Sequence, residues 1–454
     1  MNRLAVIDIV GLSEKLIGEH TPFLSQWLKD KHLSQIDPVL PAVTCSAQTT
    51  YLTGKWPSEH GIVGNGWFFK DTQEVSLWKQ SNKLVQAENI WDIARKKNPD
   101  FTVANMFWWF NMYSTADYTV TPRPQYRADG QKKPDCYAKP GALRDELKQQ
   151  LGTFPLFDFW GPRTTIKSSK WIAEASKVVE EKYSPTLLLV YLPHLDYVLQ
   201  KFDQANPNVA KDLQEIDDLC KDLISTLEKR GMEVMVLSEY GISKATQPVH
   251  LNRRFRENGL IQIREENGLE LLDAGESKAF AVADHQVAHV YINDLSRKEQ
   301  VKKILEDTPG VELVLDEKGK KEYHIQHERA GDLVVVAAEN HWFTYYYWLD
   351  DQKAPDFARV VDIHKKPGYD PVEMFFDPKK KFIFPRLAFK LLKKKLGFRT
   401  LMDVIPLDAS LVKGSHGRVN IDKQDKPVLI SKEEKAASID PTQIQELILQ
   451  KIFA

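Results

Sequence analysis

A threonine stands near the predicted start of a short helix, where its hydroxyl could serve as a nucleophile. The segment from Pro41 to Asn65, PAVTCSAQTTYLTGKWPSEHGIVGN, predicts a helix over 45–53 that ends at Gly54. The N-terminus of a helix leaves backbone N–H groups unpaired and attracts anions. Thr44 is therefore either a helix cap, as threonine often is, or a metal-bound hydroxyl that attacks phosphorus.

Three carboxylates accompany apolar runs elsewhere in the chain. Asp8 lies in LAVIDIVG, Asp196 ends PTLLLVYLPHLD, and Glu239 lies in MEVMVLSEYG. Such apolar runs are typical of strands buried on both faces, and the amphipathic stretch between the last two predicts a parallel crossover. Ligands bind at the carboxyl ends of parallel strands. We therefore expect these three carboxylates to converge with Thr44 and His416, which lies between two glycines in VKGSHGRVN.

The segment around Thr44 and these later motifs resemble the nucleotide pyrophosphatase/phosphodiesterase branch of the alkaline phosphatase superfamily, the type I phosphodiesterase family. Thr44 falls on the nucleophile of that family and Asn65 on the asparagine that binds a phosphoryl oxygen. Other motifs also fall in register: Thr53-Gly54, Pro57, His60-Gly61-Ile62, Asp8, Asp196, SEYG at 238–241 and GSHG at 414–417.

The resemblance implies an α/β fold, an alkaline-phosphatase-like three-layer core with a mostly parallel sheet. A smaller α+β cap is inserted into such a core. On this basis residues 1–280 form the first part of the core and 281–350 the cap. Residues 351–454 return to the core and carry the last expected metal ligand, His416.

The resemblance also implies metal ligands, although the chain departs from the family pattern at three of them. Gln200 stands where a histidine is expected four residues after an aspartate, and Glu239-Tyr240 replaces an Asp-His pair. The ligand set carried over is Asp196, Gln200 and His416 for one metal, and Asp8, Thr44, Glu239 and Tyr240 for the other.

These departures change the expected metal. Imidazole favours zinc, whereas carboxylate, amide and phenol oxygens favour harder ions such as Mg²⁺, Mn²⁺ or Ca²⁺. We expect one or two divalent metal ions, either zinc or, given the oxygen-rich set, magnesium or manganese. Three further histidines are alternative ligands: His194, His285 and His289. Of these, His285 beside Asp284 fits a polar residue at a strand edge somewhat better than it fits a metal ligand.

The resemblance implies a metal-dependent phosphohydrolase, of phosphodiesterase or nucleotide pyrophosphatase type, that acts on a small phosphorylated substrate. Thr44 would form a phospho-threonine intermediate, and Asn65 would hold phosphoryl oxygens. The substitutions Gln200, Glu239 and Tyr240 motivate an alternative, a degenerate member that binds a phosphorylated metabolite or lipid without turnover. A phosphonate hydrolase or a phosphoryl transferase is a third interpretation.

The charge and composition of the chain limit the partners and the cellular compartment that we expect. The 454 residues carry a formal net charge of -1, which gives no argument for binding a nucleic-acid polymer. The cysteines Cys45, Cys136 and Cys220 are few and dispersed, which fits a reducing compartment. The N-terminal apolar run is short and interrupted by Asp8, so we expect neither a signal peptide nor a membrane span, and a cytoplasmic location.

One segment near the C-terminus is both basic and apolar. KKKFIFPRLAFKLLKKKLGFR, residues 379–399, is typical of helices that lie on anionic membrane surfaces. Pro385 is expected to interrupt it, and its apolar residues could equally pack onto the core: Leu387, Phe389, Leu391 and Leu392. Peripheral membrane contact through 379–399 is thus one of two interpretations, and the oligomeric state is left open.

Overall fold

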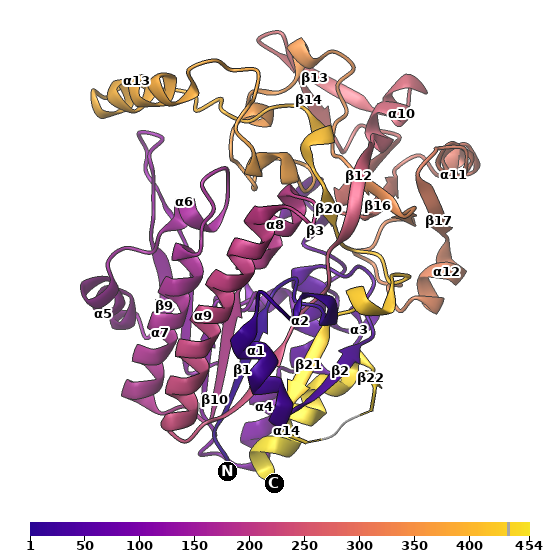
Figure 1. Ribbon diagram of the computed structural model, residues 1–454. Coiled ribbons are helices and arrows are strands. Elements are labelled where there is room, and N and C mark those ends of the chain that lie inside the picture. The colour runs from indigo at the N-terminus through magenta and orange to yellow at the C-terminus, as the bar shows by residue number, and fades with distance from the viewer. Residues whose placement is uncertain (434–435) are drawn as a thin grey trace.

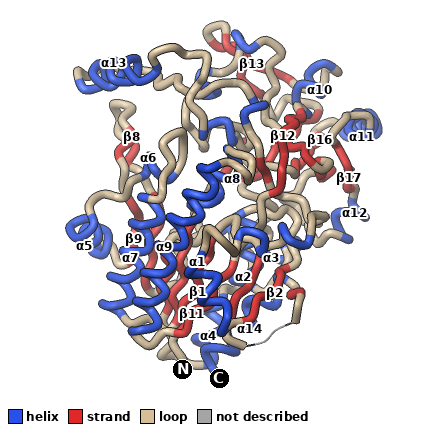
Figure 2. The backbone as a smooth tube through the Cα atoms, viewed as in Figure 1, coloured by secondary structure: helices blue, strands red, loops and turns tan. Residues whose placement is uncertain are grey.

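The computed structural model of the chain, described for residues 1–433 and 436–454, is built on one large sheet of nine strands (Figures 1 and 2). These strands are β1 (Leu4–Ile9), β2 (His32–Ile36), β5 (Val103–Met106), β6 (Tyr118–Pro122), β9 (Cys136–Lys139), β10 (Leu187–Leu192), β11 (Glu233–Leu237), β21 (Val428–Ser431) and β22 (Ser438–Ile439). Their spatial order is β22-β2-β21-β11-β1-β10-β5-β6-β9. The central five, from β11 to β6, run parallel, whereas β21 and β9 are antiparallel to their neighbours. The predicted mostly parallel α/β core is confirmed.

Helices pack in two groups around this sheet (Figure 1). One group contacts β5, β10 and β11, and the other contacts β1. The first group comprises α1 (Pro22–Trp27), α7 (Lys167–Tyr183) and α9 (Pro207–Lys229), and the second comprises α2 (Thr44–Thr53), α4 (Ile90–Lys97) and α14 (Ile444–Phe453). Four more helices belong to the part of the chain that builds the large sheet: α3 (Pro57–His60), α5 (Ala142–Leu151), α6 (Leu156–Phe159) and α8 (His194–Lys201). Helix α9 buries Leu213, Ile216 and Leu223 as its periodicity predicts.

A second apolar cluster surrounds a four-stranded antiparallel sheet of order β15-β16-β18-β17. Its elements are β15 (Ala279–Asp284), β16 (Val287–Ile292), α11 (Lys298–Glu306), β17 (Val311–Leu315), α12 (Glu317–Glu322) and β18 (Leu333–Ala337). This confirms the α+β cap. The cluster also takes in side chains from 245–274 and 354–412, so the boundaries at 281 and 351 remain predictions.

Small sheets and two helices complete the described fold. They are β3 (Gly66–Phe69) with β4 (Glu74–Leu77), β7 (Gln125–Tyr126) with β8 (Lys132–Lys133), β13 (Gln262–Glu266) with β14 (Leu269–Asp273), and β12 (Ser243–Val249) with β19 (Asn340–Phe343) and β20 (Gly414–Ser415). Helix α10 (Leu251–Glu257) contacts β15, and α13 (Ile383–Lys395) projects from the molecule as an arm (Figure 1).

Two local expectations need correction. Strand β10 ends at Leu192 and Asp196 lies in the first turn of α8, because Pro193 cannot continue the strand. Pro385 does not interrupt α13: it lies in the first turn, where a backbone N–H has no helical partner to lose. In the described part of the chain, every helix is too short or too polar to cross a bilayer.

Candidate active site

The structure brings the predicted site residues together at the carboxyl edge of the parallel strands. Asp8 lies in β1, between β10 and β11, and Glu239 follows β11 by two residues. Asp196 begins α8 directly after β10, and His416 follows β20. All four are buried, as is Thr44. The convergence expected from strand ends is thus observed.

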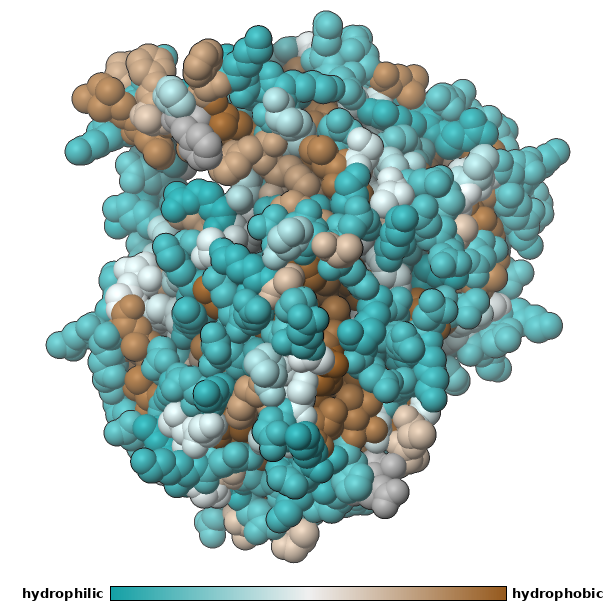
Figure 3. Space-filling model, viewed as in Figure 1, coloured by the Kyte–Doolittle hydropathy of each residue, from teal (hydrophilic) through white to brown (hydrophobic). Residues whose placement is uncertain are grey.

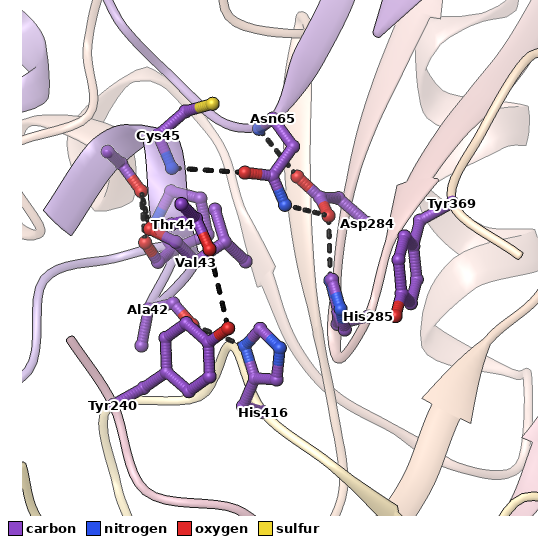
Figure 4. A network of polar contacts seen from close by, with 12 residues as sticks. Ala42, Val43, Thr44, Cys45, Asn65, Tyr240, Asp284, His285, Tyr369 and His416 are labelled. Atoms are coloured by element: carbon purple, nitrogen blue, oxygen red, sulfur yellow. Dashed lines mark hydrogen bonds and ion pairs between the residues drawn. The ribbon is translucent and has the colours of Figure 1, made fainter. Parts of the chain in front are cut away.

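Thr44 is the first residue of α2 rather than its cap. The N-cap is Val43, and no side chain caps the helix, so the cap interpretation of Thr44 is wrong. The Thr44 hydroxyl instead lies 3.3 Å from the Tyr240 hydroxyl (Figure 4), and it lies near enough to Glu239 to lower the pKa of that carboxyl. The hydroxyl therefore faces the cluster of acidic and aromatic groups.

Asp8 and Glu239 form a buried carboxyl pair that a third residue bridges. The Gln48 amide nitrogen donates to Asp8 Oδ2 at 3.2 Å and to Glu239 Oε1 at 2.5 Å, and its oxygen accepts from the Trp109 N–H at 2.6 Å. Sequence reasoning missed Gln48. Its spacing of four residues from Thr44, which places both on one face of α2, was the available signal.

Burial dominates the electrostatics of the acidic groups. It raises the pKa of Asp8 to about 7 and that of Asp196 to about 7. The pKa of Glu239 is raised by burial and then by the negative charge of Asp8. Because like charges this close cannot both ionise readily, the Asp8–Glu239 pair holds either a proton or a cation near neutral pH.

Asp196 accepts hydrogen bonds on both carboxylate oxygens. The Tyr240 hydroxyl donates to Oδ1 at 3.1 Å, and the Gln200 amide nitrogen donates to Oδ2 at 2.8 Å. The Gln200 oxygen, the one atom of that side chain that could ligate a metal, accepts from the Tyr369 hydroxyl at 3.0 Å. In this arrangement Gln200 and Tyr240 orient Asp196.

His416 is held in the tautomer that leaves Nε2 as an acceptor. Its Nδ1 lies 2.7 Å from the Ala42 carbonyl, which can only accept, so Nδ1 carries the proton (Figure 4). Nε2 lies 3.7 Å from Asp196 Oδ1 and has no hydrogen-bond partner among the described residues. The ring stacks on Tyr240 with centroids 3.5 Å apart, and burial lowers its pKa.

Asn65 links the start of α2 to the cap. Its Oδ1 accepts from the Cys45 N–H at 3.1 Å, and its Nδ2 donates to Asp284 Oδ1 at 3.1 Å. Asp284 also accepts from the Asn65 backbone N–H and from His285 Nδ1 at 2.8 Å (Figure 4). One of the two Nδ2 hydrogens of Asn65 is left for another acceptor.

The three alternative histidines have different surroundings. His285 lies in the site, stacked on Tyr369 at 3.5 Å and 3.8 Å from the His416 ring. His194 faces away, toward Asp212 and Glu215 of α9, with Nε2 3.5 and 3.6 Å from their carboxylates. His289 uses both ring nitrogens on the backbone of Val63 and Gly331. Only the first of these three shares the site, which sequence spacing could not distinguish.

The donor atoms fit a hard divalent cation. Three buried atoms have no hydrogen-bond partner within the described ranges: Asp8 Oδ1, Glu239 Oε2 and His416 Nε2. A buried polar atom without a partner costs about 1–3 kcal/mol, which a bound cation would offset. Because carboxylate and hydroxyl oxygens outnumber imidazoles, the set suits Mg²⁺ or Mn²⁺ better than a zinc pair.

A cavity of about 480 Å³ opens from this cluster. Thr44, Asp196, Tyr240 and His285 line its polar end. Aromatic and aliphatic side chains line most of the remainder, among them Trp78, Trp109, Phe159, Trp160, Val360, Val361, Leu387, Leu391 and Leu401. A volume of this size accommodates a small organic ligand with a substantial apolar part.

Comparison with known sequences identifies relatives of the chain. Residues 4–370 match the family described as type I phosphodiesterase/nucleotide pyrophosphatase. An uncharacterized pyrophosphatase/phosphodiesterase of Schizosaccharomyces pombe is 28% identical over 250 residues, which is 52% of this chain and 44% of the relative. Ectonucleotide pyrophosphatase/phosphodiesterase 2 of Saccharomyces cerevisiae is 26% identical over 262 residues, which is 52% of this chain and 47% of the relative. The chain thus spans less than half the length of these curated relatives.

Solved structures share the fold. Murine ectonucleotide pyrophosphatase/phosphodiesterase 5, in an inactive variant in complex with AMP, matches with a TM-score of 0.60 at 13% identity, over 100% of this chain and 95% of that one. Phosphonoacetate hydrolase from Sinorhizobium meliloti, in complex with phosphonoformate, matches with a TM-score of 0.62 at 14% identity, over 99% and 96%.

Proposed function

The chain belongs to the type I phosphodiesterase/nucleotide pyrophosphatase family, and on that premise we propose that it hydrolyses phosphodiester or pyrophosphate bonds of a small phosphorylated substrate. The observation that carries the proposal is the position of Thr44. This residue begins helix α2 and lines the cavity, and its hydroxyl faces Glu239 and Tyr240. A buried hydroxyl beside a carboxyl with a raised pKa is the arrangement of an activated nucleophile.

The side chains then have separate tasks. Glu239 in its ionised form takes the Thr44 hydroxyl proton as Thr44 Oγ1 forms its bond to phosphorus. The bond from phosphorus to the leaving oxygen breaks, Glu239 passes the proton to that oxygen, and a phospho-threonine remains. In the second step water attacks phosphorus and loses a proton to Glu239, which returns it to the Thr44 oxygen as the phosphorus–Oγ1 bond breaks. The free Nδ2 hydrogen of Asn65 donates to a phosphoryl oxygen in both steps.

Asp8, Glu239, Thr44, Asp196 and His416 would hold one or two divalent cations. When bound, such a cation supplies Lewis acidity, which lowers the pKa of a hydroxyl and offsets phosphoryl charge. Gln200 and Tyr240 are proposed to keep Asp196 ionised and oriented through their hydrogen bonds.

The test measures hydrolysis of bis-p-nitrophenyl phosphate and of a nucleotide diester with Mg²⁺, Mn²⁺ and Zn²⁺. Thr44→Ala should abolish hydrolysis, while Thr50→Ala, on the same helix but bonded to His60, should keep it. Isolation of a phosphorylated peptide that contains residue 44 after acid quenching would support the intermediate. Equal rates for the wild type and Thr44→Ala would refute the proposed nucleophile.

A second candidate function is binding without turnover. It is favoured by Asp196, whose two oxygens are already occupied by neutral donors where the family has histidine ligands. An inert wild-type protein that binds phosphate esters by calorimetry, with and without divalent cations, would support this alternative over the hydrolase.

A further inference from the structure

We propose that the arm around α13 binds an anionic lipid bilayer, and that the substrate of the Thr44 site is an amphiphilic phosphate ester whose apolar chain enters the cavity from that bilayer. We define the α13 arm as residues 379–402. The substrate part of this proposal rests on the proposed function, whereas the docking part stands on the surface alone.

The arm concentrates exposed apolar side chains. Seven of the thirteen large apolar residues that are exposed in the described part of the chain lie between 382 and 401, so they form a patch and not a scatter. Phe389, Leu392 and Leu396 follow a helical spacing of three and four residues and are 57%, 53% and 66% exposed. Figure 3 shows this apolar surface on the projecting arm.

The arm is also strongly basic. Residues 378–402 contain nine basic residues and no acidic one, in a chain whose net charge is -1. Asp403 pairs with Lys380 and Lys390, which ties the arm to its base, and no ion pair joins the others to an acidic group within the described residues. The basic residues are Lys379, Lys380, Lys381, Arg386, Lys390, Lys393, Lys394, Lys395 and Arg399.

This combination specifies one occupant. A second protein or a segment of this chain could cover an apolar stripe, but the surrounding positive charge selects a surface that is both anionic and apolar beneath. An anionic bilayer presents both, because its phosphate layer lies over hydrocarbon. The amphipathic character of α13 therefore points to binding in the plane of the interface.

The cavity connects this surface to the nucleophile. Leu387, Leu391 and Lys394 of α13 line the cavity, and Thr44 and Tyr240 line the same cavity at its polar end. One face of α13 is thus exposed for contact with a bilayer, and another face lines the cavity that leads to the Thr44 hydroxyl. A chain that enters beside α13 would place its phosphate group at the site.

The lining favours an alkyl or prenyl chain over a nucleoside. Val360, Val361, Leu387, Leu391 and Leu401 provide aliphatic contacts. Each methylene transferred from water to such a lining gains binding energy, and most of the lining offers no hydrogen bond that would read a base or a ribose. A nucleoside would have to pair its polar edges with the fewer polar side chains of the lining, such as Gln80, Lys132 and His364.

Sedimentation with vesicles tests the docking part. Wild-type protein should bind vesicles of phosphatidylcholine with about one third phosphatidylglycerol, and binding should weaken at high salt because the Debye length shrinks from ~10 Å to ~3 Å. Phe389→Asp/Leu392→Asp/Leu396→Asp should lose at least about 100-fold in partitioning. Lys393→Glu/Lys395→Glu should lose at least about 25-fold, from about fivefold per charge.

Matched controls change the same chemistry elsewhere. Leu295→Asp/Leu349→Asp alters two leucines that are 67% and 55% exposed away from the arm, and Lys318→Glu/Lys321→Glu alters two lysines of α12. Both controls should bind vesicles like the wild type. Wild-type protein that does not bind the anionic vesicles, or an arm variant that binds as well as its control, overturns the docking part.

A series of p-nitrophenyl alkyl phosphodiesters, from methyl to decyl, tests the substrate part. kcat/KM should rise with chain length, by up to about fourfold per methylene that becomes buried. The arm variants should keep the wild-type rate on the methyl ester, since their substituted residues do not line the cavity. A rate independent of chain length, or a nucleoside ester preferred over the decyl ester, overturns this part.

The two hypotheses fail separately. Vesicle binding by a protein that hydrolyses none of the diesters upholds the docking surface and refutes the proposed hydrolase. Hydrolysis of the methyl ester without vesicle binding upholds the hydrolase and refutes the docking surface.

Discussion

Gln48 gives the sharpest test of the carboxyl pair, because its amide is buried between Asp8 and Glu239. Gln48→Leu keeps a side chain of similar size but removes three hydrogen bonds, two to carboxyl oxygens and one from the Trp109 N–H. Hydrogen bonds to charged groups contribute about 1.5–3 kcal/mol each, and neutral ones about 0.5–1.5 kcal/mol. Because neighbouring losses are not additive, we expect the free energy of unfolding to fall by about 3–5 kcal/mol at pH 8 in chelator.

The matched control is Gln35→Leu. Gln35 is also buried, and its amide makes one hydrogen bond to a carboxylate, Glu14 Oε2 at 2.9 Å. Loss of this single bond should cost about 1–2 kcal/mol. Urea unfolding followed by tryptophan fluorescence measures both variants under the same conditions.

Two further conditions sharpen the comparison. At pH 5 Asp8, whose pKa is about 7, is protonated and its O–H can donate within the pair, so the cost of Gln48→Leu should shrink. Saturating Mg²⁺ should shrink it as well, since a cation satisfies the same oxygens. If Gln48→Leu costs no more than Gln35→Leu at pH 8 in chelator, the bridging role assigned to Gln48 is refuted.

The remaining predictions concern the same cluster. Burial raises the pKa of Glu239 and of Asp8, so the native state holds protons that the unfolded chain releases, and their contribution to stability is lost as the pH rises through the folded pKa, about 7 for Asp8. In chelator, the Tm of Glu239→Gln minus that of the wild type should therefore become more positive from pH 5 to pH 8; a constant difference would contradict this. Gln200→His/Tyr240→His should raise zinc affinity over magnesium affinity in calorimetry, because imidazole suits zinc, and unchanged selectivity would exclude these positions as ligands. Asn65→Ala should lower kcat on bis-p-nitrophenyl phosphate by about 10²–10³-fold if its amide holds a developing charge, and a loss below tenfold would remove it from that role.

The core elements of the fold were predictable from local patterns. LAVIDIVG and LLLVYL are apolar without interruption apart from Asp8, and both form strands of the parallel sheet. The sequence of residues 44–54 predicted a helix that ends at Gly54. Helix α2 does end there, with Gly54 as a left-handed C-cap whose φ is +62°. Local sequence decides such features because strand and helix periodicity and backbone strain act between near neighbours.

The membership of the site was only partly predictable. The strand-end rule found Asp8, Asp196 and Glu239, since the edge of a parallel sheet gathers its carboxyl ends. It could not separate His285 from His194, which differ in the direction that each side chain takes from its element.

The sequence by itself determined the residue types, three central strands of the large sheet with the crossover helix between two of them, and the family of the chain. Only the tertiary structure decided that Gln48 bridges two carboxyls, that Asp284 of the cap reaches Asn65, and that an apolar cavity runs from Thr44 to α13. The physical reason is that these features join residues about 40 to 350 positions apart. Their hydrogen bonds and their raised or lowered pKa values exist only after packing has removed water from between them.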